Sequence, residues 1–410
     1  MPDFLHTSNG SPAGVRHSTG RMLLPTDTGA RSRGDLLLTG STGFLGMELL
    51  ARLLEESDRR VWAPVRAADD AEAEARLRAT LTTLLPDPGM YSERVVAIAA
   101  DLTQPGLGLE ARRRDEIAEH VTEIIHSAAS VSFTLPLEEA RAINVEGTRR
   151  MLELAADVHA RGGLTRYAHV STAYVAGDHS GNFSEDDHDL GQGFNNTYEE
   201  SKWEAEKLVR ERGEELPVQV FRPSIVVGHE RSGWTASFNV IYTPLRMYAR
   251  GALPLIPARR SAPVDIVPVS YVARAILALD HAGAGRTFNL VAGPDAPTMD
   301  ALIDLTVSHF DGPPIRTVSP AVYRRTVEPV LMRRATPAQK RWIEQTKVFF
   351  PYFSSAVRFQ ADATRAALEP LGVQAPVLGD YFGRLVDYAV GCRWGGRKVG
   401  RAQARAAAAV

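Results

Sequence analysis

Short apolar runs alternate with amphipathic stretches over the first half of the chain. The apolar runs are interpreted as strands at 35–40, 60–67, 94–102, 122–129, 166–175 and 218–228. The stretches between them, such as 44–57 and 145–162, repeat apolar residues at helical spacing, and 66–87 predicts a further, highly charged helix. Strands that alternate with helices in this way predict an α/β fold, a parallel, doubly wound sheet with helices on both faces.

The pattern changes toward both ends of the chain, which predicts the domain organisation. Residues 1–33 are rich in Gly, Ser, Thr, Pro and Arg without periodicity, so we expect a disordered leader. The sheet domain is expected at 34–228. The pattern then loosens, so 229–392 is expected to form a smaller, mixed, substrate-binding lobe, with 264–290 packing back on the sheet domain. The last residues, 393–410, are basic and low in complexity, and we expect a flexible tail.

Composition excludes several classes of function. The 410 residues include 44% hydrophobic and 23% charged residues, as in ordinary globular proteins, and the net charge of −2 gives no reason to expect nucleic acid or an anionic membrane as a partner. The single cysteine, Cys392, excludes an intrachain disulfide and fits a reducing cytoplasm. The sequence has no zinc-ligand pattern and no apolar run long enough to span a membrane.

A glycine-rich loop follows the first strand and opens the first helix. In "LLLTGSTGFLG" the glycines are Gly40, Gly43 and Gly46. They permit a tight turn and a close approach of the backbone to a pyrophosphate, which rests on the helix N-terminus. The spacing G-x-x-G-x-x-G differs from G-x-G-x-x-G, so a turn of different shape is expected. The loop residues predicted to bind a dinucleotide are Gly40, Ser41, Thr42, Gly43, Phe44, Leu45 and Gly46.

The ends of the next strands predict which dinucleotide is bound. An acid at the end of the second strand favours NAD, but this chain has Arg66 there, and a guanidinium matches a 2′-phosphate. NADP(H) is therefore predicted. Arg52 is either a second arginine for that phosphate or a surface residue. Asp101 and Leu102 are expected near the adenine, and the small Ala128 and Ala129 would let the cofactor pass closely.

A charged run, "NNTYEESKWEAEKLVRERGEE", contains one pair with a different meaning. Alternating charges are typical of the solvated side of a helix. Tyr198 and Lys202 stand four residues apart, so they share one face of that helix. The run therefore predicts a helix with a solvated face and a second face that carries a phenol and an amine.

The order of these motifs resembles the extended short-chain dehydrogenase/reductases. The motifs are "TGSTGFLG", "HSAA", "NVEGT", "VSTAYV", "YEESK" and "FRPSIVVG". The runs "IIHSAASVSFTLPLEEARAINVEGT" and "SKWEAEKLV" look more narrowly like the thioester reductase branch, which includes the terminal reductase domains of carboxylic acid reductases and nonribosomal peptide synthetases, and the fatty acyl-CoA reductases. The resemblance covers about residues 34–290 and implies that 34–228 is an NADP-binding Rossmann-type domain.

The resemblance also implies roles for individual residues. Tyr198 and Lys202 match the family's Tyr-x-x-x-Lys pair, and Thr172 matches its hydroxyl residue, with Ser171 as the alternative. Because successive strand residues point to opposite faces, only one of these two hydroxyls can line the site. Asn144 is expected among the residues of the cofactor site, where it supports a helix bend or a water near Lys202, with a purely structural role as the alternative. The segment Pro223, Ser224 and Ile225 is expected to run beside the nicotinamide.

These residue types suit reduction of a carbonyl group. An ammonium one helical turn away should lower the pKa of Tyr198, which can then deliver a proton as hydride reaches the carbon. The Thr172 hydroxyl would donate to the same oxygen. The implied reaction is reduction of an acyl thioester by NADPH to the aldehyde, with a further step to the alcohol left open.

Two alternative functions compete with this interpretation. A nucleotide-sugar epimerase or hydroxysteroid-type dehydrogenase would use the same fold, although Ala173 and Tyr174 stand where sugar dehydratases have an Asp-Glu pair. A cofactor-binding regulator without catalysis is the second alternative. Intact Thr172, Tyr198 and Lys202 argue against it.

The form of the substrate follows from what this sequence lacks. It contains neither an adenylation domain nor a carrier domain, so we expect the thioester to arrive as a CoA ester or on a separate carrier protein. Basic patches at Arg259–Arg260 and Arg393–Lys398 are either contacts for that partner or solvated surface. The aromatic stretch 233–257 is either an acyl-chain site or ordinary core.

Overall fold

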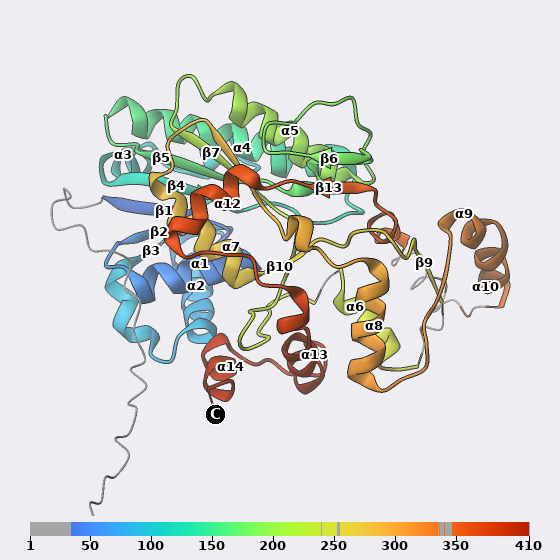
Figure 1. Ribbon diagram of the computed structural model, residues 1–410. Helices are drawn as coiled ribbons and strands as arrows, with labels where there is room; N and C mark the ends of the chain where they lie inside the picture. Colours follow the sequence, from blue (N-terminus) through green and yellow to red (C-terminus); the bar gives the residue numbers. More distant parts are fainter. Residues whose placement is uncertain are drawn as a thin grey trace, which may run out of the picture. The chain divides into compact units, whose positions relative to one another are not determined.

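A parallel seven-stranded sheet organises the chain. The computed structural model describes residues 34–238, 240–251, 255–334, 336, 340 and 347–409, so the leader predicted at 1–33 lies outside the described residues. The strand order is β3-β2-β1-β4-β5-β7-β11, and every pairing is parallel (Figure 1). The strands are β1 (Asp35–Thr39), β2 (Val61–Val65), β3 (Val95–Ala99), β4 (Val121–His126), β5 (Arg166–Val170), β7 (Val218–Pro223) and β11 (Arg286–Leu290). The predicted α/β fold is confirmed.

Helices cover both faces of this sheet. One face carries α1 (Phe44–Glu56), α2 (Asp70–Leu84) and α7 (Val269–Ala278), and the other carries α3 (Ala111–His120), α4 (Leu137–Ala160) and α5 (Thr197–Glu211) (Figure 1). Leu36 and Leu38 pack with the first group, and Leu37 packs with the second. Each is fully buried, and burying a leucine contributes about 1.5–3 kcal/mol. The apolar strands predicted from sequence are therefore buried on both faces.

The last predicted strand, 218–228, is divided between two sheets. β7 ends at Pro223, and β8 (Ile225–Val227) pairs with β10 (Ile266–Pro268) in a separate two-stranded sheet. The Ile225 amide donates to the Asp265 carbonyl, whereas the Ser224 amide still donates to Leu290. The backbone therefore changes partners at Ser224, at the boundary between the two parts of the chain.

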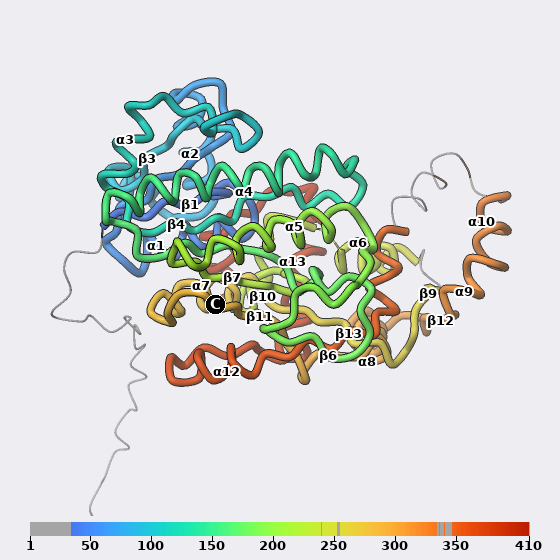
Figure 2. The backbone as a smooth tube through the Cα atoms, turned by 90° about the horizontal axis from the view of Figure 1, so that it is seen from above, coloured from blue at the N-terminus to red at the C-terminus, as the bar shows by residue number. Residues whose placement is uncertain are grey.

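A second core lies beyond β8. It joins side chains of α6 (Tyr242–Tyr248), α8 (Met299–Phe310) and α13 (Phe382–Gly391). The remaining strands are β6 (Gly181–Phe183), β9 (Leu255–Pro257), β12 (Arg316–Val318) and β13 (Val357–Phe359), paired β9 with β12 and β6 with β13. The remaining helices are α9 (Pro320–Val322), α10 (Glu328–Arg334), α12 (Asp362–Leu368) and α14 (Arg401–Ala407). Figure 2 shows α4 and α5 running side by side, with α9 and α10 at the end away from α3.

The C-terminal segment differs from the flexible tail that the sequence predicted. Residues 401–407 form α14, and Arg401 is only 2% exposed. Arg401 is ion-paired with Glu48 at 2.7 Å and with Glu55 at 3.0 Å, both on α1. The low-complexity composition concealed this contact, because the partners of Arg401 lie at the other end of the chain. Arg393, Arg397 and Lys398 are exposed, as expected for solvated charge.

Candidate active site

A cavity of about 1120 Å³ opens beside the carboxyl ends of the central strands. It lies where the strand order reverses, between β1 and β4, which is the usual ligand position in open α/β sheets. Most of the residues singled out in the sequence line it: Gly40, Thr42, Gly43, Phe44, Leu45, Gly46, Arg66, Asp101, Leu102, Ala128, Ala129, Thr172, Tyr198, Lys202, Pro223, Ser224 and Ile225. The tertiary structure thus brings these separate motifs to one cavity.

The glycine loop requires its glycines for geometric reasons. Gly40 has φ +75°, and a Cβ there would lie 2.9 Å from the Ala128 amide nitrogen. A Cβ on Gly46 would lie 1.9 Å from the Gly40 carbonyl oxygen. Gly43 is the N-cap of α1, so the positive end of this helix begins at the cavity. Ser41 does not line the cavity, since its side chain is fully buried, but its neighbours provide a backbone cradle suited to a pyrophosphate.

Two arginines line one end of the cavity. Arg66 is exposed just beyond β2, as the sequence predicted. Arg76, on α2, was missed because nothing in a highly charged helix distinguishes one arginine; its guanidinium donates to the Arg66 carbonyl. Arg52 is not part of this group, because it is largely buried and ion-paired with Glu48 and Glu56. Its role as a second phosphate-binding arginine is therefore not supported.

Asp101 stands near these arginines. Hydrogen bonds from the Thr103 amide and hydroxyl, both 2.8 Å, lower the pKa of its carboxyl, and Arg66 contributes to the same shift. The carboxylate is thus ionised and oriented at neutral pH. Leu102 follows it in the cavity wall, where the sequence predicted an adenine.

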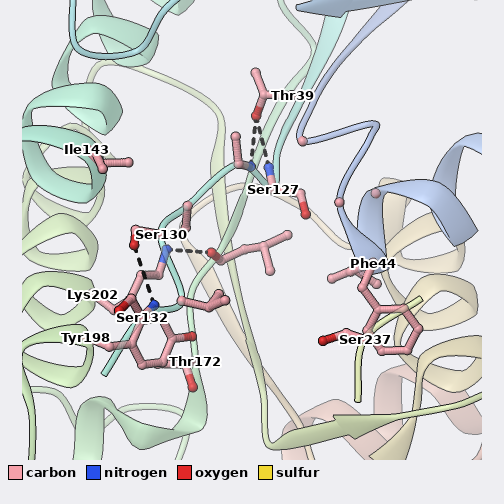
Figure 3. Close-up of a pocket in the computed structure, with 18 of the residues that line it drawn as sticks. Thr39, Phe44, Ser127, Ser130, Ser132, Ile143, Thr172, Tyr198, Lys202 and Ser237 are labelled. Carbon is pink, nitrogen blue, oxygen red and sulfur yellow. Dashed lines mark hydrogen bonds between the residues drawn. The ribbon is translucent and has the colours of Figure 1, made fainter. Parts of the chain in front are cut away.

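The loop after β4 is held from both sides. The Thr39 hydroxyl accepts hydrogen bonds from the amides of Ser127 (3.2 Å) and Ala128 (3.1 Å), as Figure 3 shows. Asn144 accepts from the Ser130 amide at 2.8 Å and donates to the Ser201 hydroxyl at 3.0 Å. Asn144 does not line the cavity, so of its two predicted roles the structural one fits: it ties the loop to α5.

Thr172, Tyr198 and Lys202 lie together at the other end of the cavity (Figure 3). Thr172 follows β5, and its hydroxyl accepts from the Tyr174 amide at 3.2 Å. Tyr198 and Lys202 both project from α5, whose N-terminus is capped by Asn196. Lys202 donates from Nζ to the Val170 carbonyl at 2.8 Å. The helix spacing and the end of β5 together bring an amine, a phenol and a hydroxyl to one place.

The acidity of Tyr198 differs from the sequence-based expectation. Burial raises the pKa of Tyr198 to about 12, although a hydrogen bond with Thr172 acts in the opposite direction. The Lys202 amine donates to the Val170 carbonyl, and the pKa of Tyr198 is set by burial, Thr172 and Glu199. Burial also lowers the pKa of Lys202 to about 8, against the attraction of Glu206. Tyr198 is therefore a protonated hydrogen-bond donor at neutral pH.

Ser171 also lines the cavity, but its hydroxyl is engaged elsewhere. Its hydroxyl donates to Glu206 at 2.7 Å. Glu206 is fully buried and ion-paired with Arg222 at 2.7 Å. Burial alone would raise the pKa of Glu206, but Arg222 lowers it to about 2. Ser171 is thus committed to a buried ionic cluster, which leaves Thr172 as the hydroxyl beside Tyr198.

An aromatic wall that the sequence did not reveal completes the cavity. Its members are Phe133, Tyr174, Tyr198, Phe349 and Tyr352. Phe133 stacks on Tyr198 with centroids 5.6 Å apart and on Tyr352 at 5.5 Å. By contrast, Trp234, Tyr242 and Tyr248 of the stretch 233–257 are buried in the core, and among the described residues of that stretch only Ala236, Ser237 and Val240 line the cavity. The members of this wall come from segments that lie far apart in the sequence, so no local sequence pattern predicted it.

The residues present fit a phosphorylated dinucleotide. The cavity offers a cradle that Cβ atoms would fill, two guanidinium groups at one end and Lys202 at the other.

Within the described part of the chain, no cluster of His, Cys, Asp and Glu could hold a metal ion. Across the same residues, no helix has the length and apolar character needed to cross a bilayer.

Known proteins resemble this chain in sequence and in fold. Residues 38–276 match the family model described as male sterility protein, an NAD-binding domain. The fatty acyl-CoA reductase wat of Drosophila melanogaster is 30% identical over 281 residues, which cover 59% of this chain and 53% of that protein. A linear gramicidin synthase of Brevibacillus parabrevis is 32% identical over 279 residues, which cover 65% of this chain and 5% of that protein.

A solved structure supports the same grouping over more of the chain. The terminal R domain from the myxalamid PKS-NRPS biosynthetic pathway superposes with a TM-score of 0.75 at 28% identity, covering 91% of this chain and 94% of that domain. The chain spans about half, or far less, of the two curated relatives, so their full activities extend beyond what this match covers.

Proposed function

The chain belongs to the male sterility protein family of NAD-binding domains within the extended short-chain dehydrogenase/reductases, and on that premise we propose that it is an NADPH-dependent reductase of acyl thioesters. One observation carries the proposal: a single cavity joins the glycine loop and two arginines to Thr172, Tyr198 and Lys202. The product is the aldehyde, with reduction to the alcohol as a second step of the same chemistry.

The two arginines are the basis for assigning NADPH. A 2′-phosphate is a dianionic group, and arginine guanidinium groups bind phosphates with charge-assisted hydrogen bonds. Arg66 is exposed at the cavity and Arg76 lies beside it. No carboxylate occupies the end of β2, where an NAD-specific site has one.

Thr172, Tyr198 and Lys202 form the proposed catalytic group, which acts on the thioester carbonyl. NADPH, when bound, supplies hydride to the carbonyl carbon. Thr172 and Tyr198 donate hydrogen bonds to the carbonyl oxygen, on which negative charge develops, and so stabilise the tetrahedral species. Because Tyr198 is protonated, it delivers the proton that this oxygen requires. Collapse of the hemithioacetal then breaks the carbon–sulfur bond and releases the thiol and the aldehyde.

The aromatic wall is the proposed site of the acyl group. Phe133, Tyr174 and Tyr352 lie next to Tyr198 and offer apolar ring surface to a chain attached at the reacting carbonyl. The thioester arrives on CoA or on a carrier protein. Of the predicted basic pair Arg259–Arg260, Arg260 is ion-paired with Asp300 at 3.0 Å.

The proposal is tested by NADPH oxidation with a panel of acyl-CoA and carrier-bound thioesters, followed by mass spectrometry of the products. We expect Tyr198→Phe to reduce kcat by about 10²–10⁴-fold, the usual contribution of a general acid. Tyr248→Phe is the matched control, because its hydroxyl donates to Pro313 outside the cavity. Equal rates for wild type and Tyr198→Phe would remove Tyr198 from the mechanism, and a wild type inactive with every thioester would remove the function.

A further inference from the structure

Two buried histidines, His126 and His169, lie near Lys202 but do not belong to the proposed catalytic group. His126 ends β4 and His169 lies in β5, and the two are paired in register on adjacent strands. Their ring centroids are 5.6 Å apart, and their exposed fractions are 2% and 0%. Neither lines the cavity. Three of the four ring nitrogens have hydrogen-bond partners among the described residues, and these partners show what each ring does.

The tautomer of His126 follows from Thr39. The Thr39 hydroxyl oxygen already accepts two amide hydrogen bonds, so it donates its own hydrogen to Nδ1 of His126, 2.8 Å away. Nε2 of His126 therefore carries the hydrogen and donates to the Thr148 hydroxyl at 3.3 Å. Burial lowers the pKa of His126 to about 3, which keeps the ring neutral. His126 is thus fully engaged in holding the loop that follows β4.

His169 has a different partner. Its Nε2 lies 3.4 Å from Nζ of Lys202, and an ammonium group can only donate. Nε2 of His169 therefore accepts, and the ring hydrogen is on Nδ1, which has no hydrogen-bond partner among the described residues. Burial and the nearby Lys202 lower the pKa of His169 well below its usual value, so the ring remains a neutral acceptor.

The three hydrogens of the Lys202 ammonium are then accounted for. One points to the Val170 carbonyl at 2.8 Å and one to His169, which leaves the third for the cavity that Lys202 lines. Two fixed acceptors on adjacent residues of one strand orient a side chain that otherwise has four rotatable bonds. The direction of the third hydrogen is set by these two contacts.

We propose that His169 is a positioning residue which, by accepting at Nε2, aims the Lys202 ammonium into the cofactor end of the catalytic cavity. The inference rests on the proposed function, because the aimed hydrogen serves the nicotinamide ribose. His169 touches neither substrate nor cofactor and acts only through Lys202. His126 instead holds the loop after β4 through Thr39, so the two histidines support different parts of the cavity lining.

Other groups facing Lys202 do not replace this acceptor. Glu206 attracts it from the same helix, but its carboxylate is bonded to Arg222, Arg210 and Ser171. Tyr198 is protonated, and both nitrogens of His126 are occupied. Removing the His169 acceptor therefore leaves the Lys202 ammonium with the Val170 carbonyl as its only fixed partner among these groups.

A pair of variants of equal length tests the proposal. His169→Gln retains an oxygen acceptor near the position of Nε2, whereas His169→Met fills the same space with a much weaker one. Tyr167→Phe is the control: it removes a buried hydroxyl two residues earlier on β5 that has no hydrogen-bond partner among the described residues. The measurements are NADPH dissociation constants by fluorescence, without acyl substrate, and kcat and KM across pH.

The expected results separate positioning from folding. His169→Met should lower kcat/KM for NADPH by about 10- to 100-fold, since a hydrogen bond to a charged group is lost. Its alkaline pH limit should move to lower pH, because the ammonium form loses an acceptor. His169→Gln should recover most of the loss at similar thermal stability, and Tyr167→Phe should match the wild type. If His169→Met does not fold, His169→Phe serves as the variant without an acceptor.

Two outcomes would contradict the inference in different ways. If the variants without an acceptor bind NADPH like the wild type and keep its pH profile, or if Gln is as damaging as Met, His169 does not position Lys202 and the proposed function is unaffected. If the wild type binds no NADPH at all, the proposed function fails and this inference falls with it.

Discussion

Burial controls the chemistry of single residues in this site more than spacing along the sequence does. The four-residue spacing of Tyr198 and Lys202 suggested an amine that acidifies a phenol. The structure turns the amine toward Val170 and His169, and burial makes the phenol a weaker acid. Tyr198 is consequently protonated at neutral pH, so it can donate a hydrogen bond. Lys202 is a cation that is directed at the proposed cofactor site.

Arg66 and Arg76 provide a prediction at the residue scale. We expect Arg66→Ala or Arg76→Ala to weaken NADPH binding by about 10- to 100-fold, the value of hydrogen bonds to a charged group. NADH binding should change little, because NADH lacks the 2′-phosphate. Titration of both cofactors by fluorescence measures the difference.

Arg78→Ala is the matched control for these variants. It lies on the same helix, is exposed and pairs with Glu74, but does not line the cavity. A parallel loss of NADPH and NADH affinity would show that the arginines support the loop and do not recognise the 2′-phosphate.

Among the elements, α14 has the least expected role. It begins where Gly400 approaches Thr83 of α2 so closely that a Cβ would lie 2.7 Å from the Thr83 carbonyl oxygen. Arg401 then reaches Glu48 and Glu55 on α1, the helix that opens at the glycine loop. Burial alone would raise the pKa of Glu48, but Arg401 and Arg52 lower it. The last helix thus neutralises a buried carboxylate on the first.

Arg401→Met tests this contact between elements. The substitution leaves Glu48 buried with only Arg52, and breaking a buried ion pair costs about 3–5 kcal/mol, so we expect a loss near 3 kcal/mol in the free energy of unfolding. Arg405→Met, at an exposed ion pair with Glu55, should cost less than about 1 kcal/mol. Urea denaturation measures both.

Two further results would qualify this prediction. The double variant Arg401→Met with Glu48→Gln should recover part of the loss, because no unpaired charge remains buried. The folded-state pKa of Glu48 is lowered, so its ionised form stabilises the fold at neutral pH and this contribution is lost as the pH falls through that value. An Arg401→Met protein as stable as the wild type would mean that α14 is dispensable.

At the scale of the whole molecule, Tyr352 forms two hydrogen bonds at the start of α5, the helix that carries Tyr198 and Lys202. The Tyr352 hydroxyl donates to Glu199 at 2.5 Å and accepts from Asn196 at 2.8 Å, at the N-terminus of α5. Glu199 is fully buried, and burial raises its pKa. The ring of Tyr352 also lies edge-on to Tyr174 at 4.8 Å in the aromatic wall. Tyr352, a member of the second core, therefore contacts the residue that follows Tyr198.

Tyr352→Phe tests this connection between the two lobes. The variant keeps the ring in the wall but removes the partner of a buried carboxyl, a change worth about 1–3 kcal/mol. We expect KM for the thioester to rise by about 10-fold, while the NADPH dissociation constant stays near the wild-type value. Steady-state kinetics with each substrate varied separately make the distinction.

Tyr323→Phe is the comparison variant, because Tyr323 is buried in the same lobe against Phe350 and does not line the cavity. If Tyr352→Phe weakened NADPH and thioester equally, the contact would support the fold as a whole and not the acyl site.

Much of the fold and part of the site were predictable from sequence, for definite reasons. The strands that are buried on both faces, such as that around Leu36–Leu38, read as continuous apolar runs, so the order of elements was visible. Gly40 and Gly46 were recognisable because only glycine fits their backbone. Phe133 and Tyr352 carried no such local signal, since each gains its role from a partner far away in the chain. Arg76 carried none because it is one arginine in a highly charged helix.

The sequence by itself determined the parallel α/β architecture, the glycine loop, and the motifs that carry Thr172, Tyr198 and Lys202, because periodicity, steric demands and helix spacing are local properties. The tertiary structure alone decided which groups are charged and where they point. It buried Lys202 and directed it toward His169, left Tyr198 half-buried in the cavity wall, separated Arg52 from the cavity and placed Arg401 against Glu48. Desolvation and ion pairing depend on neighbours that only the folded chain brings together.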